Sequence, residues 1–141
     1  MSRLYCIDGT NLVRTAYGYG GPAHSVQEYA DTDRVTVIFT QLCEDAGGKV
    51  EVELFFDGAF RALGGSRSDN FRVRFTREVP ADDMILDRVR SRKWNGEKTT
   101  VVTADVELGE MAEAEGGQWM HVGHGSAPEG VARKIGGRFL K

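Results

Sequence analysis

Short apolar runs alternate along this chain with longer segments in which apolar residues recur every three or four positions. Apolar or β-branched runs predict strands, whereas the recurring pattern predicts helices that bury one side. The expected strands are residues 3–7, 50–56, 71–75, 99–103 and 118–122. Strands that alternate with helices indicate an α/β sandwich around a mostly parallel sheet, in which helices cover both faces.

Three segments are expected to form helices. In residues 31–46 apolar side chains recur at helical intervals, although the hexamer VTVIFT within this segment is also typical of a strand. A second helix is expected to begin near Pro80, because proline is favoured in the first turn of a helix. A third covers residues 106–115 and ends before two glycines. The glycine-rich loop at 17–24 and the tail at 123–141 receive no assignment.

Length and composition are those of one ordinary folded domain. The chain has 141 residues, of which 40% are hydrophobic and 28% charged, so we expect a single domain over residues 1–141 with a basic, glycine-rich tail at 123–141. No apolar run approaches the ~20 residues of a membrane-spanning helix, and a secretion signal is not expected. Cys6 and Cys43 lie in apolar segments, which favours buried free thiols. The expected location is therefore the reducing cytoplasm, with no membrane partner.

Positive charge is concentrated in a few segments, although the formal net charge is −3. Five arginines lie between residues 61 and 77, against one acid, Asp69. The final segment adds Arg133, Lys134, Arg138 and Lys141. Such a segment is either solvated surface or a patch that attracts a polyanion such as a nucleic acid.

Aspartates follow three of the expected strands and begin one of the expected helices. Asp8, Asp57 and Asp105 follow the first, second and fourth strands, and Asp82 and Asp83 come directly after Pro80 and Ala81. The carboxyl ends of parallel strands share one edge of the sheet, where the binding crevice of such folds forms. Several carboxylates at one edge repel each other unless a cation lies among them. Mg²⁺ or Mn²⁺ suits such a site, because both ions take oxygen ligands and retain water.

Four of these aspartates also have a purely structural interpretation. Asp105 is suited to cap the helix that follows it, and Asp82 and Asp83 suit the positive end of theirs. Asp57, followed by glycine, is typical of a turn. Taken singly, the acids favour these structural roles. Their convergence at one edge of the sheet favours a cation site instead.

Four motifs in a fixed order resemble those of a known family. They are IDGTN at 7–11, FFDG at 55–58, ADDMI at 81–85 and VVTAD at 101–105. The series resembles that of PIN-like NYN domains, in particular the bacterial YacP-like endoribonucleases, over most of the chain. The resemblance implies a three-layer α/β/α sandwich with a five-stranded sheet in the order 3-2-1-4-5. It also implies a Mg²⁺- or Mn²⁺-dependent endoribonuclease that acts in RNA decay or processing.

The same resemblance implies roles for individual residues. Asp8, Asp82 and Asp105 match the metal-binding positions of the family, which hold the ion directly or through water. Asp83 matches a fourth acid. Asn11 is implied to orient Asp8 or to contact a phosphate. These five residues are the expected catalytic group.

An RNA substrate requires cations for its phosphates. Arg61 follows the FFDG turn, Arg67 lies in the loop GGSRSDN, and Lys134 lies in the basic tail. Thr103, at the end of the fourth strand, is expected to hold a water molecule or a carboxylate. These four residues are the expected substrate-binding group.

The leading functional hypothesis is a metal-dependent endoribonuclease. The alternative is an RNA-binding module with little catalysis that acts through a partner such as the ribosome. Clustered acids repel phosphate, so a pure binding module has no need of them, and they favour the enzyme. A phosphatase of the haloacid-dehalogenase type is disfavoured, because its nucleophilic aspartate would stand at the position of Cys6.

Overall fold

A five-stranded parallel sheet forms the centre of the protein. The computed structural model describes residues 3–20, 26–65, 68–123 and 126–137. The strands are β1 (Arg3–Asp8), β2 (Val50–Phe56), β3 (Phe71–Phe75), β4 (Thr99–Thr103) and β5 (Gln118–His121). Their order is β3-β2-β1-β4-β5, and every neighbouring pair is parallel. The predicted order is confirmed, and the sheet is parallel throughout.

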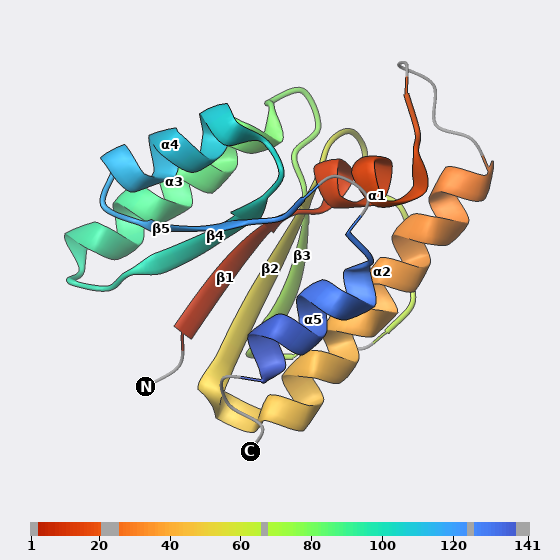
Figure 1. Cartoon of the computed structure of the whole chain (residues 1–141), viewed down its shortest axis with the longest axis horizontal. Helices are drawn as coiled ribbons and strands as arrows, with labels where there is room; N and C mark the ends of the chain where they lie inside the picture. Colours follow the sequence, from red (N-terminus) through yellow and green to blue (C-terminus); the bar gives the residue numbers. More distant parts are fainter. Residues whose placement is uncertain (1–2, 21–25, 66–67, 124–125, 138–141) are drawn as a thin grey trace.

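Helices cover both faces of this sheet, so the fold is the predicted three-layer sandwich. The helices are α1 (Gly9–Tyr17), α2 (Val26–Ala46), α3 (Ala81–Trp94), α4 (Val106–Ala114) and α5 (Pro128–Gly136), with a short 3₁₀ helix, η1 (Gly47–Lys49), after α2. Figure 1 shows α3 and α4 over one face of the sheet and α2 and α5 over the other. None of the described helices has both the length and the apolar composition that crossing a membrane requires.

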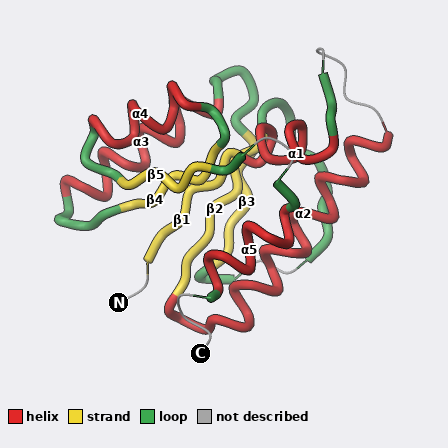
Figure 2. Tube along the Cα trace, viewed as in Figure 1, coloured by secondary structure: helices red, strands yellow, loops and turns green. Residues whose placement is uncertain are grey.

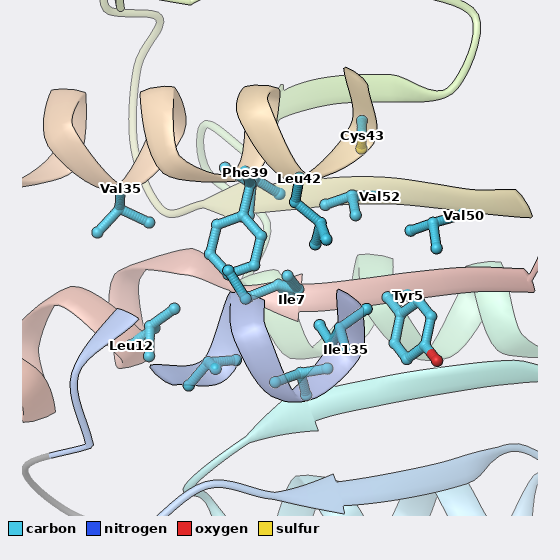
Figure 3. Close-up of a cluster of buried hydrophobic side chains, with 14 of the residues drawn as sticks. Tyr5, Ile7, Leu12, Val35, Phe39, Leu42, Cys43, Val50, Val52 and Ile135 are labelled. Carbon is cyan, nitrogen blue, oxygen red and sulfur yellow. The ribbon is translucent and has the colours of Figure 1, made fainter. Parts of the chain in front are cut away.

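The larger hydrophobic core lies between the sheet and α2, α5 and α1. Phe39 and Leu42 of α2 point toward Ile7 of β1, and Ile135 of α5 and Leu12 of α1 complete the same cluster (Figure 3). All five side chains are buried. Burial of each side chain of this size stabilises a fold by about 1.5–3 kcal/mol. A second buried cluster fills the space between the sheet and α3 and α4.

The structure differs from the predicted elements mainly in its helices. Helix α2 begins at Val26 rather than at residue 31, and the segment after β1, for which no helix was assigned, forms α1. Helix α5 lies within the tail that received no assignment. The remaining differences are small, since β5 ends at His121 and α4 at Ala114, one residue earlier than expected in each case.

A buried glutamate on β2 binds two arginines, one of them from the basic segment at 61–77. Glu53 is 2% exposed, and its two carboxylate oxygens accept hydrogen bonds from Arg74 Nε at 2.7 Å and Arg88 Nε at 2.8 Å. Because a buried carboxylate needs such partners, these two cations join β3 and α3 to β2 through Glu53. They are structural residues rather than free sites for a polyanion.

Close packing at one glycine gives a prediction for stability. A Cβ at Gly109 of α4 would lie 2.1 Å from ring atoms of Trp119, whose Nε1 donates to the Thr103 carbonyl at 3.2 Å. Gly109→Ala is therefore expected to destabilise the fold by about 1–3 kcal/mol, because the indole cannot move without losing that bond. The free energy of unfolding in urea measures the effect.

Gly130 of α5 is the matched control, since no described heavy atom lies within 4 Å of its Cβ position. Gly130→Ala is expected to stabilise the protein by about 0.4–1 kcal/mol, because alanine restricts the unfolded chain more than glycine does. Equal changes in the two variants would contradict the packing described at Gly109.

Candidate functional site

Asp8 ends β1 at the edge of the sheet where the loops after β2 and β4 also lie (Figure 2). Its side chain is 5% exposed, and its Oδ1 accepts a hydrogen bond from Asn11 N at 3.2 Å, which caps α1. The next residue is Gly9, and a larger residue would not fit there, because a Cβ would lie 2.5 Å from the ring of Phe56. Close packing of α1 on β2 thus explains the glycine, and helix capping explains part of the role of Asp8.

Neighbouring acids and burial make Asp8 difficult to ionise. The pKa of Asp8 is raised to about 7, chiefly by burial and then by the negative charges of Asp82, Asp57 and Asp105, against the lowering effect of the Asn11 backbone hydrogen bond. Four aspartates from three strand ends and one helix start therefore interact at one edge of the sheet. We call Asp8, Asp57, Asp82 and Asp105 the carboxylate edge.

Asp82 lies in the first turn of α3 and is half-buried. Partial burial raises the pKa of Asp82, as do the charges of Asp105, Asp57 and Asp83 in that order. Asp83, beside it in the same turn, is exposed. Asp82 therefore lies near the other three acids of the carboxylate edge, whereas Asp83 is exposed to solvent beside them.

Asp57 and Asp105 each cap a helix, as well as contributing negative charge to the carboxylate edge. Asp57 Oδ1 accepts from Ala81 N at 3.1 Å and thereby caps α3. Asp105 Oδ1 accepts from Glu107 N at 3.0 Å and Leu108 N at 3.3 Å and caps α4, as predicted. The turn interpretation of Asp57 is incomplete, because its carboxylate fixes the helix that carries Asp82. These bonds engage Oδ1 of each residue and do not involve Oδ2.

Asn11 and Thr103 form a hydrogen-bond network beneath the acids. Asn11 Oδ1 accepts from Ala104 N at 3.0 Å and from Thr103 Oγ1 at 3.4 Å. Thr103 Oγ1 accepts from Asp105 N at 3.1 Å, and Thr103 is buried. The two side chains join the start of α1 to the end of β4, so they position Asp8 and Asp105 relative to each other.

Thr10 has a similar positioning role that the sequence did not reveal. Its Oγ1 accepts a hydrogen bond from Asp57 N at 2.8 Å, which joins the end of β1 to the end of β2. A hydroxyl residue directly after a strand-ending Asp-Gly pair is the only signal in the sequence for this contact. The two residues are 47 positions apart in the chain, and local sequence patterns carry no information on contacts of that separation.

The expected cations are distributed differently from the acids. Arg61 is close to them, because its Nη2 donates to the Asp57 carbonyl at 2.6 Å. Lys134 is exposed on α5 and lines a hollow of about 320 Å³ together with His121 and Gly123, and none of the four acids lines this hollow. Arg67 lies outside the described residues.

A divalent cation suits the donors at the carboxylate edge, although the described residues form no ready-made metal cage. Within the described segments, no group of three or more His, Cys, Asp or Glu side chains is gathered closely enough to hold a metal ion. Mg²⁺ needs no such cage, since it is commonly bound through one or two carboxylates and keeps several waters. The raised pKa of buried Asp8 is the observation that favours a cation, because an adjacent positive charge would relieve the repulsion. Asp8, Asp82 and Asp105 are the residues that could hold it.

Cys6 offers no alternative nucleophile at this edge. It lies two residues before Asp8 on β1 and is completely buried. Burial, and next the charge of Glu53, raise the pKa of the Cys6 thiol far above its usual range. A thiol of this kind stays protonated and unreactive at neutral pH.

Comparison of the chain with protein-family models, with curated proteins and with solved structures gives no match. The resemblance to PIN-like NYN domains therefore stays a prediction from the four motifs. The function has to be argued from the geometry of the carboxylate edge.

Proposed function

We propose that this protein is a Mg²⁺- or Mn²⁺-dependent endoribonuclease that hydrolyses RNA phosphodiester bonds at the carboxylate edge. The observation that carries the proposal is the buried Asp8, whose pKa is raised to about 7 by burial and by three further aspartates. A buried carboxylate among like charges is costly for the fold even with one backbone hydrogen bond, and strongly perturbed groups of this kind are concentrated at functional sites. The motif series that resembles PIN-like NYN domains supports the same function.

The residues of the edge divide into ligands and supports. Asp8, Asp82 and Asp105 hold the ion, directly or through water, and Asp83 adds negative charge at the solvent side. When bound, the ion supplies charge neutralisation at the phosphate and activation of water. Asn11 and Thr103 keep Asp8 and Asp105 in register.

Substrate is held by cations near this edge. Arg61 lies against the loop that carries Asp57 and is the nearest candidate for a backbone phosphate. Lys134 would contact a more distant part of the RNA beyond β5. Buried free thiols at Cys6 and Cys43 agree with a cytoplasmic location, where such thiols stay reduced.

A second candidate function is an RNA-binding module with little catalysis, acting through a partner such as the ribosome. One observation favours it. Asp57 and Asp105 already serve as helix caps, and the described side chains form no group of three metal ligands. Retention of RNA without cleavage would distinguish this module from an enzyme.

Cleavage of labelled oligonucleotides tests the proposal. Single-stranded RNA, duplex RNA and single-stranded DNA are incubated with the purified protein in Mg²⁺, in Mn²⁺ or in EDTA, and the products are separated by length. We expect internal cuts in RNA with either ion and none in EDTA, because without a cation the acids neither neutralise the scissile phosphate nor activate a water. An absence of cutting in every metal condition, with RNA still bound, would replace the enzyme by the binding module.

A further inference from the structure

An exposed aromatic side chain lies in the loop that leaves β2 beside the carboxylate edge. Phe60 is 70% exposed, and its ring meets Phe75 at the end of β3 with centroids 5.3 Å apart and planes at 73°. Phe75 in turn stacks on Phe56 of β2 at 6.0 Å. Phe60 is therefore an exposed ring whose edge-to-face contact is with Phe75, and Phe75 in turn packs on Phe56.

Arg61 connects this aromatic group to the acids. Its guanidinium lies 5.2 Å from the centroid of Phe75 and 5.8 Å from that of Phe56. Its hydrogen bonds go to the backbone carbonyls of Asp57 and Ala59. No carboxylate forms an ion pair with Arg61 among the described residues, so its charge remains to attract a phosphate.

A hollow of about 400 Å³ lies next to the exposed ring. Phe60, Ser68 and the five residues of β3 line it, including the exposed Arg72. Its volume is within the range of pockets that take small planar ligands. Because β3 is the last strand of the sheet, the hollow also borders backbone groups that are available to a ligand.

We propose that Phe60, Arg61 and the β3 hollow form a subsite for one unpaired nucleotide of a single-stranded RNA. The base stacks on Phe60, and the adjoining phosphate pairs with Arg61 and so lies toward Asp57. Stacking on an aromatic side chain requires a base that is free of its own duplex. The inference rests on the proposed function and deepens it, since it restricts the substrate to RNA with an unpaired nucleotide.

Charge argues for this occupant over a second copy of the chain. Two copies pairing through the β3 edge would place the same surface, with Arg72 and the Arg61 charge, against itself, because a two-fold interface is self-complementary. Exposed arginines on an edge strand are a common protection against such pairing. A polyanion carrying planar bases matches both the rings and the cations.

Binding of short fluorescein-labelled RNA in EDTA tests the subsite without cleavage. The variants are Phe60→Ala, Phe60→Trp and a control, Trp94→Ala. Trp94 is also an exposed aromatic, 91% exposed, but lies at the carboxyl end of α3, away from the acids that begin that helix. Fluorescence anisotropy gives Kd for the single strand and for the same sequence in a duplex.

Phe60→Ala is expected to weaken binding of single-stranded RNA about tenfold, the effect of losing one base stack. Phe60→Trp is expected to retain the affinity and to show indole emission that single-stranded RNA quenches beyond the response of the wild-type tryptophans. Duplex binding and the Trp94→Ala variant are expected to stay unchanged. Equal affinity of wild type and Phe60→Ala for the single strand would overturn the subsite. A shift in sedimentation of Phe60→Ala with unchanged RNA affinity would also overturn it and assign the surface to protein association.

Failure of this subsite can be told apart from failure of the nuclease. If Mn²⁺-dependent cleavage requires Asp82 while Phe60→Ala leaves Kd and KM unchanged, the nuclease stands and the subsite is overturned. If Phe60→Ala loses affinity as expected but no metal supports cleavage, the subsite is retained and the protein is an RNA-binding module rather than a nuclease.

Discussion

Asp82→Asn is expected to lower RNA cleavage by a factor on the order of 10³ while the fold stays intact. Asparagine keeps the size of the side chain but removes the negative charge that would hold a cation. The helix does not depend on this charge, because α3 is capped through Asp57 Oδ1 rather than through Asp82. Burial is the largest cause that raises the pKa of Asp82, and the neighbouring acids raise it too. Replacement of Asp82 by asparagine therefore also relieves the repulsion between these carboxylates. Initial rates of RNA cleavage in Mn²⁺, with a melting curve of each variant, measure both effects.

Asp87→Asn is the matched control on the same helix. Asp87 is exposed and pairs with Arg90 at 3.1 Å, one turn beyond the acids. Its replacement is expected to leave the rate within about twofold, since exposed ion pairs contribute about 0–1 kcal/mol. Full activity of Asp82→Asn would exclude Asp82 as a ligand, whereas its unfolding would show that the residue stabilises the helix and is not a site for a cation.

Asp8→Asn is expected to stabilise the protein at alkaline pH in EDTA. Asp8 has a pKa of about 7 in the folded state against an ordinary value of 3.8. Its protonated form is therefore favoured in the folded protein, and stability is lost as pH rises through the folded pKa. At 1.36 kcal/mol for each pKa unit, the wild type loses on the order of 3–4 kcal/mol between about pH 4 and pH 8. Asparagine has no such loss, and it can still accept the hydrogen bond from Asn11.

Urea unfolding at about pH 4 and pH 8 measures this linkage. The difference in unfolding free energy between Asp8→Asn and wild type should be small at the acid end and several kcal/mol at the alkaline end. Asp87→Asn serves again as control and is expected to follow the wild type at both pH values, because Asp87 is exposed. A constant difference across the pH range would mean that Asp8 titrates normally, which would remove the observation on which the nuclease proposal rests. Addition of Mn²⁺ at pH 8 is expected to restore stability to the wild type alone.

The sheet could be predicted from sequence because β1, β2 and β4 are mainly apolar or β-branched runs that end abruptly at polar residues. Helices α1 and α5 could not be predicted. In α1 the buried residues are Gly9, Leu12 and Val13, and two adjacent apolar side chains are too few to show a helical period. In α5 the buried Val131 and Ile135 are spaced as in a helix, but five glycines lie between 123 and 137 inclusive, a composition that disfavours a helix. The early start of α2 was concealed in the same way, since the buried polar residues Glu28 and Asp31 replace apolar ones in its first turns. Tertiary packing decided these elements where local preference was weak.

The acids of the site could be predicted because a parallel sheet brings strand ends together whatever the intervening sequence. It could not be predicted that Asp57 both belongs to the carboxylate edge and caps α3. That Asp57 caps a helix 24 positions later depends on how α3 docks, which no local pattern specifies. The exposure of Phe60 was equally hidden, because a lone phenylalanine after a turn looks the same in sequence whether it is buried or exposed. Its environment is set by Phe75, which follows on another strand.

The central place of β1 in the sheet has a consequence for synthesis of the protein. The first strand to be made pairs with β4, and Asn11 is bonded to Ala104, which is 93 positions later in the chain. Contacts of such separation form only after both partners have been made. In a nascent chain that still lacks β4 and Asp105, the carboxylate edge is incomplete. If the protein cuts RNA, the message from which it is being translated is therefore not exposed to an assembled nuclease until most of the chain has emerged.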